Sequence, residues 1–238
     1  MPDPELAARL AAVRSEISDA ARAANRSADE LTLIVVTKFH PARLVRDLVD
    51  LGVSDVGENR HQEAWEKARE LTDCPVTWHF IGQLQSNKAS AALEYADVIH
   101  SLDRMSLVTA LDKAWQRRRE TEDGLYSSAP IECFVQVNLT EDPHRGGVPE
   151  AQLEQFFTDL VGREAFSPLG IMAVAPLDEH PDDAFQRVAQ MSSLVRGVLP
   201  EARFISAGMS HDFVSAIAHG ATHLRIGTAI TGNRPSTG

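Results

Sequence analysis

The chain has 238 residues, of which 43% are hydrophobic and 24% are charged, as is ordinary for a globular protein. Its net charge of −11 argues against a role in nucleic-acid binding, because such proteins usually present a basic surface. Cys74 and Cys133 lie far apart, and the histidines follow no tight ligand spacing, so we predict neither a disulfide framework nor a metal site. The N-terminal stretch is acidic and rich in alanine, without an apolar segment. We therefore predict no signal peptide, no membrane span and a cytoplasmic location.

The first predicted element is an amphipathic helix from Pro4 to about Ala24, capped by Asp3. Its apolar residues recur at the spacing of one helix face: Leu6, Leu10, Val13 and Ile17. A polar break over Asn25–Glu30 separates this helix from the rest of the chain.

From residue 31 onward, strands and helices alternate eight times. The predicted strands are Leu31–Lys38, Val53–Gly57, Val76–Ile81, Val98–Ser101, Ile131–Asn138, Leu169–Val174, Arg203–Ser206 and His223–Ile226. The predicted helices after them are Pro41–Leu51, Arg60–Leu71, one from Ser86, Arg104–Glu120, Pro149–Val161, Pro181–Val198, Ser210–His219 and a short one near Thr228. This count favours an α/β fold of the single (β/α)8 TIM-barrel type over a doubly wound open sheet, which typically needs fewer strands. We predict one domain over residues 1–238 and, since the barrel is complete in one chain, a monomer.

Lys38 ends the apolar run of the first strand, so it lies where α/β proteins build their active sites. An amine that loses water there has a lowered pKa and becomes a nucleophile toward carbonyl carbon. The sequence thus favours Schiff-base chemistry at Lys38. The alternative interpretation is a surface lysine that marks the end of a strand.

Two loops near the C-terminus combine small residues with hydroxyl groups: Ser206–Ser210 after the seventh strand and Arg225–Ala229 after the eighth. Barrels often bind phosphate at these two loops, through backbone amides and hydroxyl groups. Each loop alone could be a simple turn with a helix cap. Together with Lys38 they are typical of a pyridoxal 5′-phosphate (PLP) site. A Schiff-base aldolase whose substrate carries the phosphate stays open at this point.

Several longer runs carry a family resemblance. They are Val36-Thr37-Lys38, Val56-Gly57-Glu58-Asn59, the run from Trp78 to Lys88, Gly208-Met209-Ser210-His211-Asp212 and the run from Arg225 to Ile230. In these runs the chain resembles the pyridoxal phosphate homeostasis protein family. These are small single-barrel proteins similar to the N-terminal domain of alanine racemase. The resemblance covers residues 5 to 232, nearly the whole chain.

The resemblance implies a role for each of seven residues. Lys38 would form the Schiff base with PLP, Ser210, Gly227 and Thr228 would hold the phosphate, and Asn59, Ser206 and Arg225 would lie around the cofactor. Arg225 would lie against the pyridine nitrogen. The resemblance also implies a carrier in PLP homeostasis, without catalytic residues or robust turnover. The apo forms of PLP-dependent enzymes are the expected recipients.

A PLP-dependent amino-acid racemase is the alternative function. Racemisation needs a base on each face of the cofactor, and two-domain racemases that resemble this barrel supply the second base as a tyrosine from their other domain. Here Tyr95 and Tyr126 both precede strands, so they are expected at the amino end of the barrel. The chain ends soon after the eighth strand, so we expect no second domain. His79 lies inside the third strand and is expected to be a hydrogen-bonded core residue.

Overall fold

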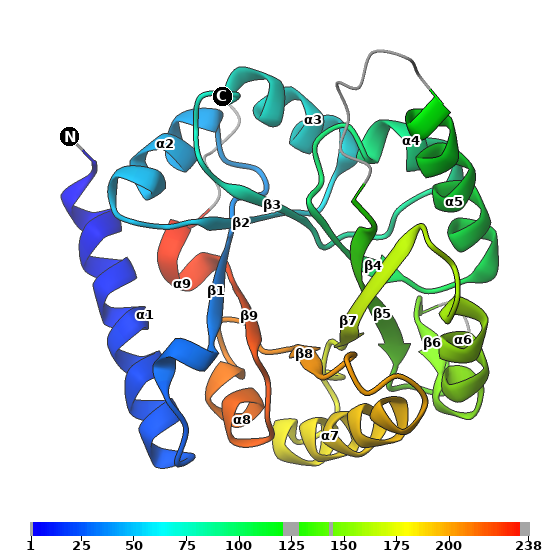
Figure 1. Ribbon diagram of the computed structural model, residues 1–238. Coiled ribbons are helices and arrows are strands. Elements are labelled where there is room, and N and C mark those ends of the chain that lie inside the picture. The colour runs from blue at the N-terminus through cyan, green and yellow to red at the C-terminus, as the bar shows by residue number, and fades with distance from the viewer. Residues whose placement is uncertain (1, 121–128, 143–144, 234–238) are drawn as a thin grey trace.

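The computed structural model describes residues 2–120, 129–142 and 145–233, and Figure 1 shows a ring of parallel strands surrounded by helices. The ring runs in the order β1-β2-β3-β4-β5-β7-β8-β9, and it is closed because β9 pairs with β1. A two-residue strand, β6, extends the sheet beside β5. The strands are β1 Thr32–Val36, β2 Asp55–Glu58, β3 Thr77–Phe80, β4 Val98–Leu102, β5 Ile131–Asn138, β6 Val148–Pro149, β7 Phe166–Met172, β8 Phe204–Ser206 and β9 His223–Ile226. The predicted (β/α)8 barrel is confirmed.

The helices alternate with the strands largely as expected. They are α1 Pro4–Ala23, α2 Ala42–Asp50, α3 His61–Glu70, α4 Ala89–Ala92, α5 Met105–Glu120, α6 Leu153–Leu160, α7 Pro181–Val198, α8 Phe213–Ala218 and α9 Thr228–Thr231. Three 3-10 turns accompany them: η1 Ala28–Glu30, η2 Ser86–Lys88 and η3 Glu150–Gln152.

A few boundaries differ from the sequence prediction. The helix expected from Ser86 is a 3-10 turn followed by only one turn of α-helix. The helix expected from Ser210 begins at Phe213, because the preceding residues form a turn in which Met209 N donates to the side chain of Asp212 at 2.5 Å. The sixth predicted strand begins at Phe166 rather than Leu169, since the pairing with β5 starts at that residue.

The first helix, α1, lies on the outer face of the barrel beside α8 and α9 (Figure 1). Its arginines bind backbone carbonyls of distant segments. Arg9 Nε donates to Ile230 O at 2.7 Å, and Arg14 donates to the carbonyls of Leu51 and Gly52. Because α9 has only four residues, it cannot cover the strands beside it. We infer that α1 takes the place of the last helix of the barrel.

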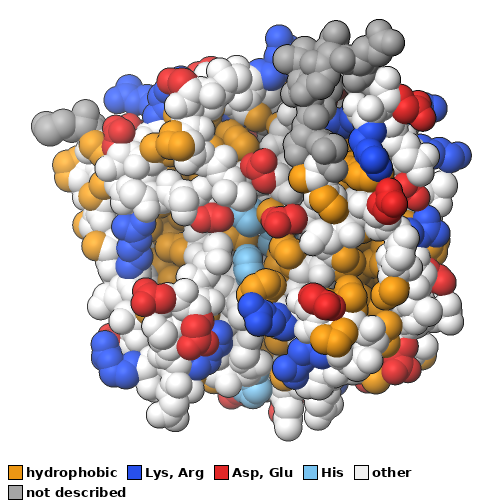
Figure 2. All heavy atoms as spheres, viewed as in Figure 1, with side chains coloured by type: hydrophobic (Ala, Val, Ile, Leu, Met, Phe, Trp, Pro, Cys, Tyr) orange, Lys and Arg blue, Asp and Glu red, His pale blue; other side chains and the backbone are white. Residues whose placement is uncertain are grey.

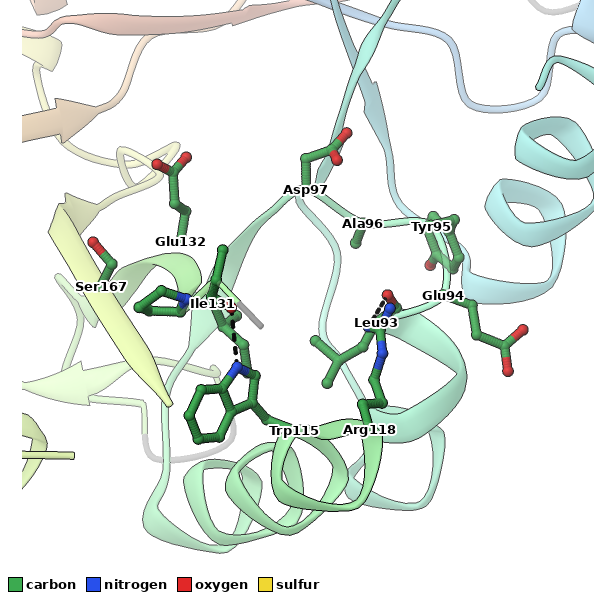
Figure 3. Close-up of a pocket in the computed structure, with 12 residues that line it drawn as sticks. Leu93, Glu94, Tyr95, Ala96, Asp97, Trp115, Arg118, Ile131, Glu132 and Ser167 are labelled. Atoms are coloured by element: carbon green, nitrogen blue, oxygen red, sulfur yellow. Dashed lines mark hydrogen bonds between the residues drawn. The ribbon is translucent and has the colours of Figure 1, made fainter. Parts of the chain in front are cut away.

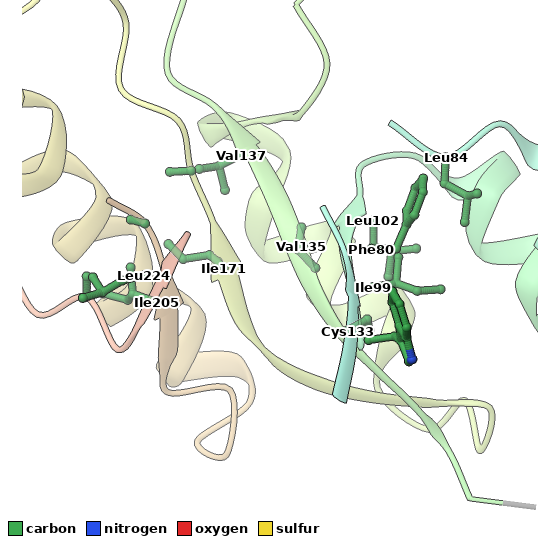
Figure 4. Close-up of a cluster of buried hydrophobic side chains, with 14 of the residues drawn as sticks. Phe80, Leu84, Ile99, Leu102, Cys133, Val135, Val137, Ile171, Ile205 and Leu224 are labelled. Atoms are coloured by element: carbon green, nitrogen blue, oxygen red, sulfur yellow. The ribbon is translucent and has the colours of Figure 1, made fainter. Parts of the chain in front are cut away.

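The apolar core lies mainly between the sheet and the helices. Figure 4 shows part of this layer, to which Ile99, Cys133, Val135, Ile171 and Leu224 contribute, all fully buried. Alternate residues of the same strands point into the barrel, since side chains along a strand alternate between its two faces. Inside the barrel, a small cluster of Val98, Phe134 and Met172 packs beside buried histidines.

In residues 2–120, 129–142 and 145–233, no helix combines the length and the apolar character needed to cross a membrane.

A substitution in α1 tests whether this helix belongs to the folded core. Leu10 is 2% exposed, so replacing it with Ala should lower the free energy of unfolding by about 3 kcal/mol through lost burial and the cavity left behind. Leu177 is 98% exposed, and Leu177→Ala is the matched control, with an expected change within about 0.5 kcal/mol. Urea unfolding measures both. Equal stability of the two variants would show that α1 does not contribute to the core.

Candidate functional site

The closed ring places Lys38 and Gly227 directly beyond the ends of neighbouring strands, although 189 positions separate them in the sequence. Strands β1 and β9 pair in register from Thr32 with His223 to Val35 with Ile226. Just beyond this ladder, a Cβ atom on Gly227 would lie 3.4 Å from Cβ of Val36. Lys38 follows two residues after β1, so its loop and the loop after β9 share the carboxyl end of the barrel.

Lys38 is half-buried, and it forms no ion pair with a carboxylate in the described part of the chain. Its Nζ lies 6.0 Å from the centre of the Phe39 ring. The amine therefore stands beyond the end of β1 with no carboxylate within ion-pair distance in the described residues.

A buried charged cluster lies behind Lys38. Lys67 Nζ donates to Glu58 Oε1 and Glu63 Oε1 at 2.7 Å each, and to the carbonyl oxygen of Thr37 at 2.9 Å. The hydroxyl group of Thr37 donates to Glu58 Oε1 at 2.6 Å. Burial raises the pKa of Glu58 although Lys67 opposes the shift, and Glu58 Oε2 has no hydrogen-bond partner among the described residues. The cluster fixes the backbone directly before Lys38.

The residue after Lys38 has an unusual backbone. Phe39 has a φ of 69°, in the left-handed region that a residue with a side chain seldom adopts. Its N–H donates to Glu63 Oε1, the same oxygen that Lys67 contacts. Such conformations persist where the surroundings impose them. The cluster therefore holds the chain on both sides of Lys38.

The loops after β8 and β9 bring hydroxyl groups and a backbone amide together. Thr228 Oγ1 donates to Ser210 Oγ, and Ala229 N donates to the same oxygen, each at 3.4 Å. Gly208 makes the close packing of this loop possible: its φ is +95°, and a Cβ there would lie 2.9 Å from Cβ of Ala216. The two loops predicted to bind phosphate thus contact one another.

Arg225 points into the barrel and is 4% exposed. It donates to Ser206 Oγ at 2.6 Å and to the carbonyl oxygen of Ala173 at 2.8 Å. Burial lowers the pKa of Arg225 to about 10, so the guanidinium keeps its charge at neutral pH. Ser206 and Arg225, both predicted to lie around a cofactor, are hydrogen-bonded to each other.

Asn59 directly follows β2, the strand that pairs with β1. The backbone of Gly82 packs against it so closely that a Cβ on Gly82 would lie 2.0 Å from the carbonyl oxygen of Asn59. A hollow of about 410 Å³ opens beside it, lined among others by Arg60, Gln83 and Lys88. Asn59 therefore belongs to the carboxyl end of the barrel, although no hydrogen bond joins its side chain to Lys38 or Arg225 in the described residues.

Some residues of this site could not be assigned from the sequence. In the sequence, Glu58 directly follows the predicted strand Val53–Gly57, and Lys67 falls within the predicted helix Arg60–Leu71. A carboxylate at the end of a buried strand is a signal that a cation lies nearby, since isolated buried charges are costly. Nothing in the sequence indicated that the cation would be Lys67.

His79 is a buried, hydrogen-bonded residue inside the barrel, as expected. Tyr95 lies in the segment before β4, and its hydroxyl group is 3.3 Å from Nδ1 of His61 at the start of α3. Tyr126 lies outside the described residues.

A larger hollow, of about 490 Å³, lies at the opposite end of the barrel (Figure 3). Its walls come from the segments before β4 and β5, from the first residues of β5 and β7 and from α5, and include Tyr95, Asp97, Trp115 and Glu132. It is therefore separate from the loops that follow the strands. No group of three metal-ligating side chains occurs within the residues that the structure describes.

Known proteins are similar to this chain over nearly its whole length. The family model described as alanine racemase, N-terminal domain, matches residues 9–235. The pyridoxal phosphate homeostasis protein of Mycobacterium bovis is 38% identical over 251 residues, covering 98% of this chain and 94% of the relative.

Solved structures show the same fold. PipY of Synechococcus elongatus, whose structure has PLP bound, is 33% identical with a TM-score of 0.81, covering 95% of this chain and 100% of PipY. An alanine racemase from Corynebacterium glutamicum has a TM-score of 0.65 at 17% identity, and the match covers 96% of this chain but 62% of the racemase. The racemase is similar in fold alone. The resemblance found in the sequence is confirmed, and this chain belongs to the pyridoxal phosphate homeostasis proteins, within the alanine racemase N-terminal domain family.

Proposed function

We propose that this protein binds PLP at the carboxyl end of the barrel, through a covalent bond between Nζ of Lys38 and the aldehyde carbon of the cofactor. One observation carries the proposal. An amine without a carboxylate partner stands at the end of β1, and a group of hydroxyl and amide donors stands at the end of the adjacent β9. Amine and anion site are the two features by which proteins hold this cofactor.

The donors present fit a phosphate group. Ser210, Thr228 and the N–H of Ala229 converge, and hydroxyl and amide groups are suitable donors to phosphate oxygens. Gly227 brings the backbone close to β1 without a side chain in the way. Because the whole chain carries a net charge of −11, attraction of the anion has to come from these local donors.

Arg225 would face the pyridine nitrogen. PLP, when bound, supplies an aldehyde and a ring that can accept electrons. A guanidinium carries a permanent positive charge and only donates hydrogen bonds. It therefore disfavours a proton, and a positive charge, on the ring nitrogen that it faces. An unprotonated ring is a weaker electron acceptor. The arrangement favours storage of the cofactor over carbanion chemistry. Asn59 and Ser206 would complete the surroundings of the ring.

The biological role proposed is PLP homeostasis, in agreement with the names of the relatives. The protein would hold the cofactor reversibly and release it to apo forms of PLP-dependent enzymes. We further propose that it acts as a cytoplasmic monomer with one domain over residues 1–238.

A PLP-dependent amino-acid racemase remains the second candidate, because alanine racemases share the fold. Such turnover needs a second base opposite Lys38. The hydroxyl group of Tyr95 instead contacts His61. Both ring nitrogens of His79 are hydrogen-bonded, one to Asp55 and the other to His100. Loss of a well-placed base typically lowers a rate by about 10²–10⁴-fold, so we expect alanine turnover to be absent or very slow. An assay of PLP-loaded protein with L-alanine distinguishes the two functions.

The covalent attachment at Lys38 can be tested by chemical trapping. Borohydride treatment of the PLP-loaded protein should fix the cofactor on the peptide that contains Lys38, as peptide mass spectrometry would show. Lys38→Ala should retain no cofactor after reduction and denaturation. Cofactor fixed on Lys67 or Lys88, with Lys38 unmodified, would disprove the assignment.

The phosphate site can be tested by removing its hydroxyl groups. Ser210→Ala combined with Thr228→Val should weaken PLP binding by about tenfold or more, because each lost hydrogen bond is worth about 1 kcal/mol. Pyridoxal, which has no phosphate, should bind both proteins equally. Titration of the apo-proteins measures these affinities. Equal affinity for PLP in the variant and the wild-type protein would place the phosphate elsewhere.

The buried cluster behind Lys38 predicts that replacing Lys67 strongly lowers the stability of the protein. Lys67→Met should leave Glu58 buried without its cation and lower the free energy of unfolding by about 3–5 kcal/mol. Lys113→Met, on the exposed face of α5, is the control and should change stability by less than about 0.5 kcal/mol. Urea unfolding of the apo-proteins measures both. A small effect of Lys67→Met would mean that Glu58 is already neutral.

A further inference from the structure

A chain of hydrogen bonds crosses the interior of the barrel from its amino end to Arg225. Asp55, at the start of β2, accepts at 2.9 Å from Nε2 of His79. Nδ1 of His79 lies 2.9 Å from Nε2 of His100, and Nδ1 of His100 lies 2.9 Å from Oγ of Ser206. Ser206 in turn accepts from Arg225 at 2.6 Å. Barrel interiors are usually filled with branched apolar side chains, so this polar chain calls for an explanation.

Arg225 is a buried cation whose hydrogen bonds go to neutral oxygens. Its described acceptors are Ser206 Oγ and the carbonyl oxygen of Ala173, and no carboxylate lies within ion-pair distance in the described residues. Burial lowers its pKa to about 10, while the charge of Asp212 acts in the opposite direction. A buried charge is costly unless it is compensated. The groups that contact Arg225 must therefore supply part of the compensation.

The two ends of this chain of hydrogen bonds, Asp55 and Arg225, determine where each proton lies. Arg225 can only donate, so the oxygen of Ser206 accepts from it and the hydroxyl proton is free to point to His100. An ionised Asp55 can only accept, so His79 carries its proton on Nε2. The Nδ1 atom of His79 then accepts from Nε2–H of His100, and Nδ1 of His100 accepts from Ser206. With one proton on each ring, this is the order that satisfies every contact.

In this order each N–H or O–H group points away from Arg225 and toward Asp55. The electron-rich end of each group faces the guanidinium, and aligned hydrogen bonds strengthen one another in a medium of low dielectric constant. The chain thus links the buried cation to a carboxylate on the other side of the barrel.

The charged and titratable groups around the chain are consistent with this order. Burial, together with the nearby His79 and Arg225, holds the pKa of His100 well below its usual range, so its ring is neutral. Burial likewise lowers the pKa of His223, from β9, to about 4. Partial burial alone would raise the pKa of Asp55, but hydrogen bonds from His79 and Ser54 outweigh it and lower the pKa. In Figure 2, histidine side chains are visible at the centre of the face in view, near acidic side chains.

We propose that Asp55 is a remote positioning residue for the cofactor site, which fixes the proton order of His79 and His100 and thereby holds Ser206 as the acceptor that orients Arg225. The effect on PLP rests on the proposed function, whereas the proton order belongs to the protein alone. Asp55 does not touch the cofactor. It acts through three intervening side chains.

The proton order can be measured on the apo-protein. In ¹⁵N-histidine NMR at neutral pH, His79 and His100 should both be neutral with the proton on Nε2, assigned by loss of signal in His79→Gln and His100→Gln. Asp55→Ala should populate both tautomers, because the obligate acceptor is gone. Asp55→Asn should retain the wild-type order, since the amide oxygen still accepts. Asp97→Ala is the matched control from the same end of the barrel, where Asp97 accepts from the backbone of Trp78, and it should change neither ring.

The same proteins are then titrated with PLP. Asp55→Ala should weaken binding by about tenfold and shift the pH dependence of the absorption of lysine-bound cofactor, with Asp55→Asn between it and the wild-type protein. Asp97→Ala should match the wild-type protein in both. A proton on Nδ1 of His79 or His100, or a charged ring, in the wild-type protein would overturn the proposal, as would unchanged tautomers and unchanged PLP binding in Asp55→Ala. If the wild-type order is found but PLP does not bind, the proposed function fails while the proton order stands.

Discussion

Closure of the sheet between β1 and β9 is the constraint on which the candidate site depends. An open sheet with the same strand order would leave Lys38 and Thr228 at opposite edges, because one follows the first strand and the other follows the last. Pairing of β9 with β1 brings the two loops to one end of one barrel. The amine and the donors of an anion site thus become neighbours as a consequence of ring closure, before any side-chain contact is considered.

Closure also creates an interior, and here that interior is polar. The layer between sheet and helices is filled with aliphatic and aromatic side chains, as in other barrels. Inside the ring, Asp55, His79, His100, Ser206 and Arg225 replace much of the apolar packing. Hydrogen bonds join each of these groups to the next, which is the condition under which buried polar groups are tolerated. The hydrogen bonds therefore run without a break from Asp55, at the amino end of the barrel, to Arg225.

The two charged assemblies of the protein support different parts of one site. The cluster around Lys67 holds the backbone on both sides of Lys38, and the chain that begins at Asp55 orients Arg225. Both use buried groups whose cost is offset only when every partner is present. The apolar layer supplies the stability that such polar assemblies require.

The sequence by itself determined the alternation of strands and helices, because apolar periodicity reports burial directly. It placed Lys38 and the two loops Ser206–Ser210 and Arg225–Ala229 at strand ends, and the family resemblance supplied Asn59 and the role of each residue. Only the tertiary structure decided which distant groups meet. That Lys67 pairs with Glu58, or that His79 bridges Asp55 and His100, depends on side chains from different strands and helices. The identity of such partners is set by packing in three dimensions, and no local pattern of residues encodes it.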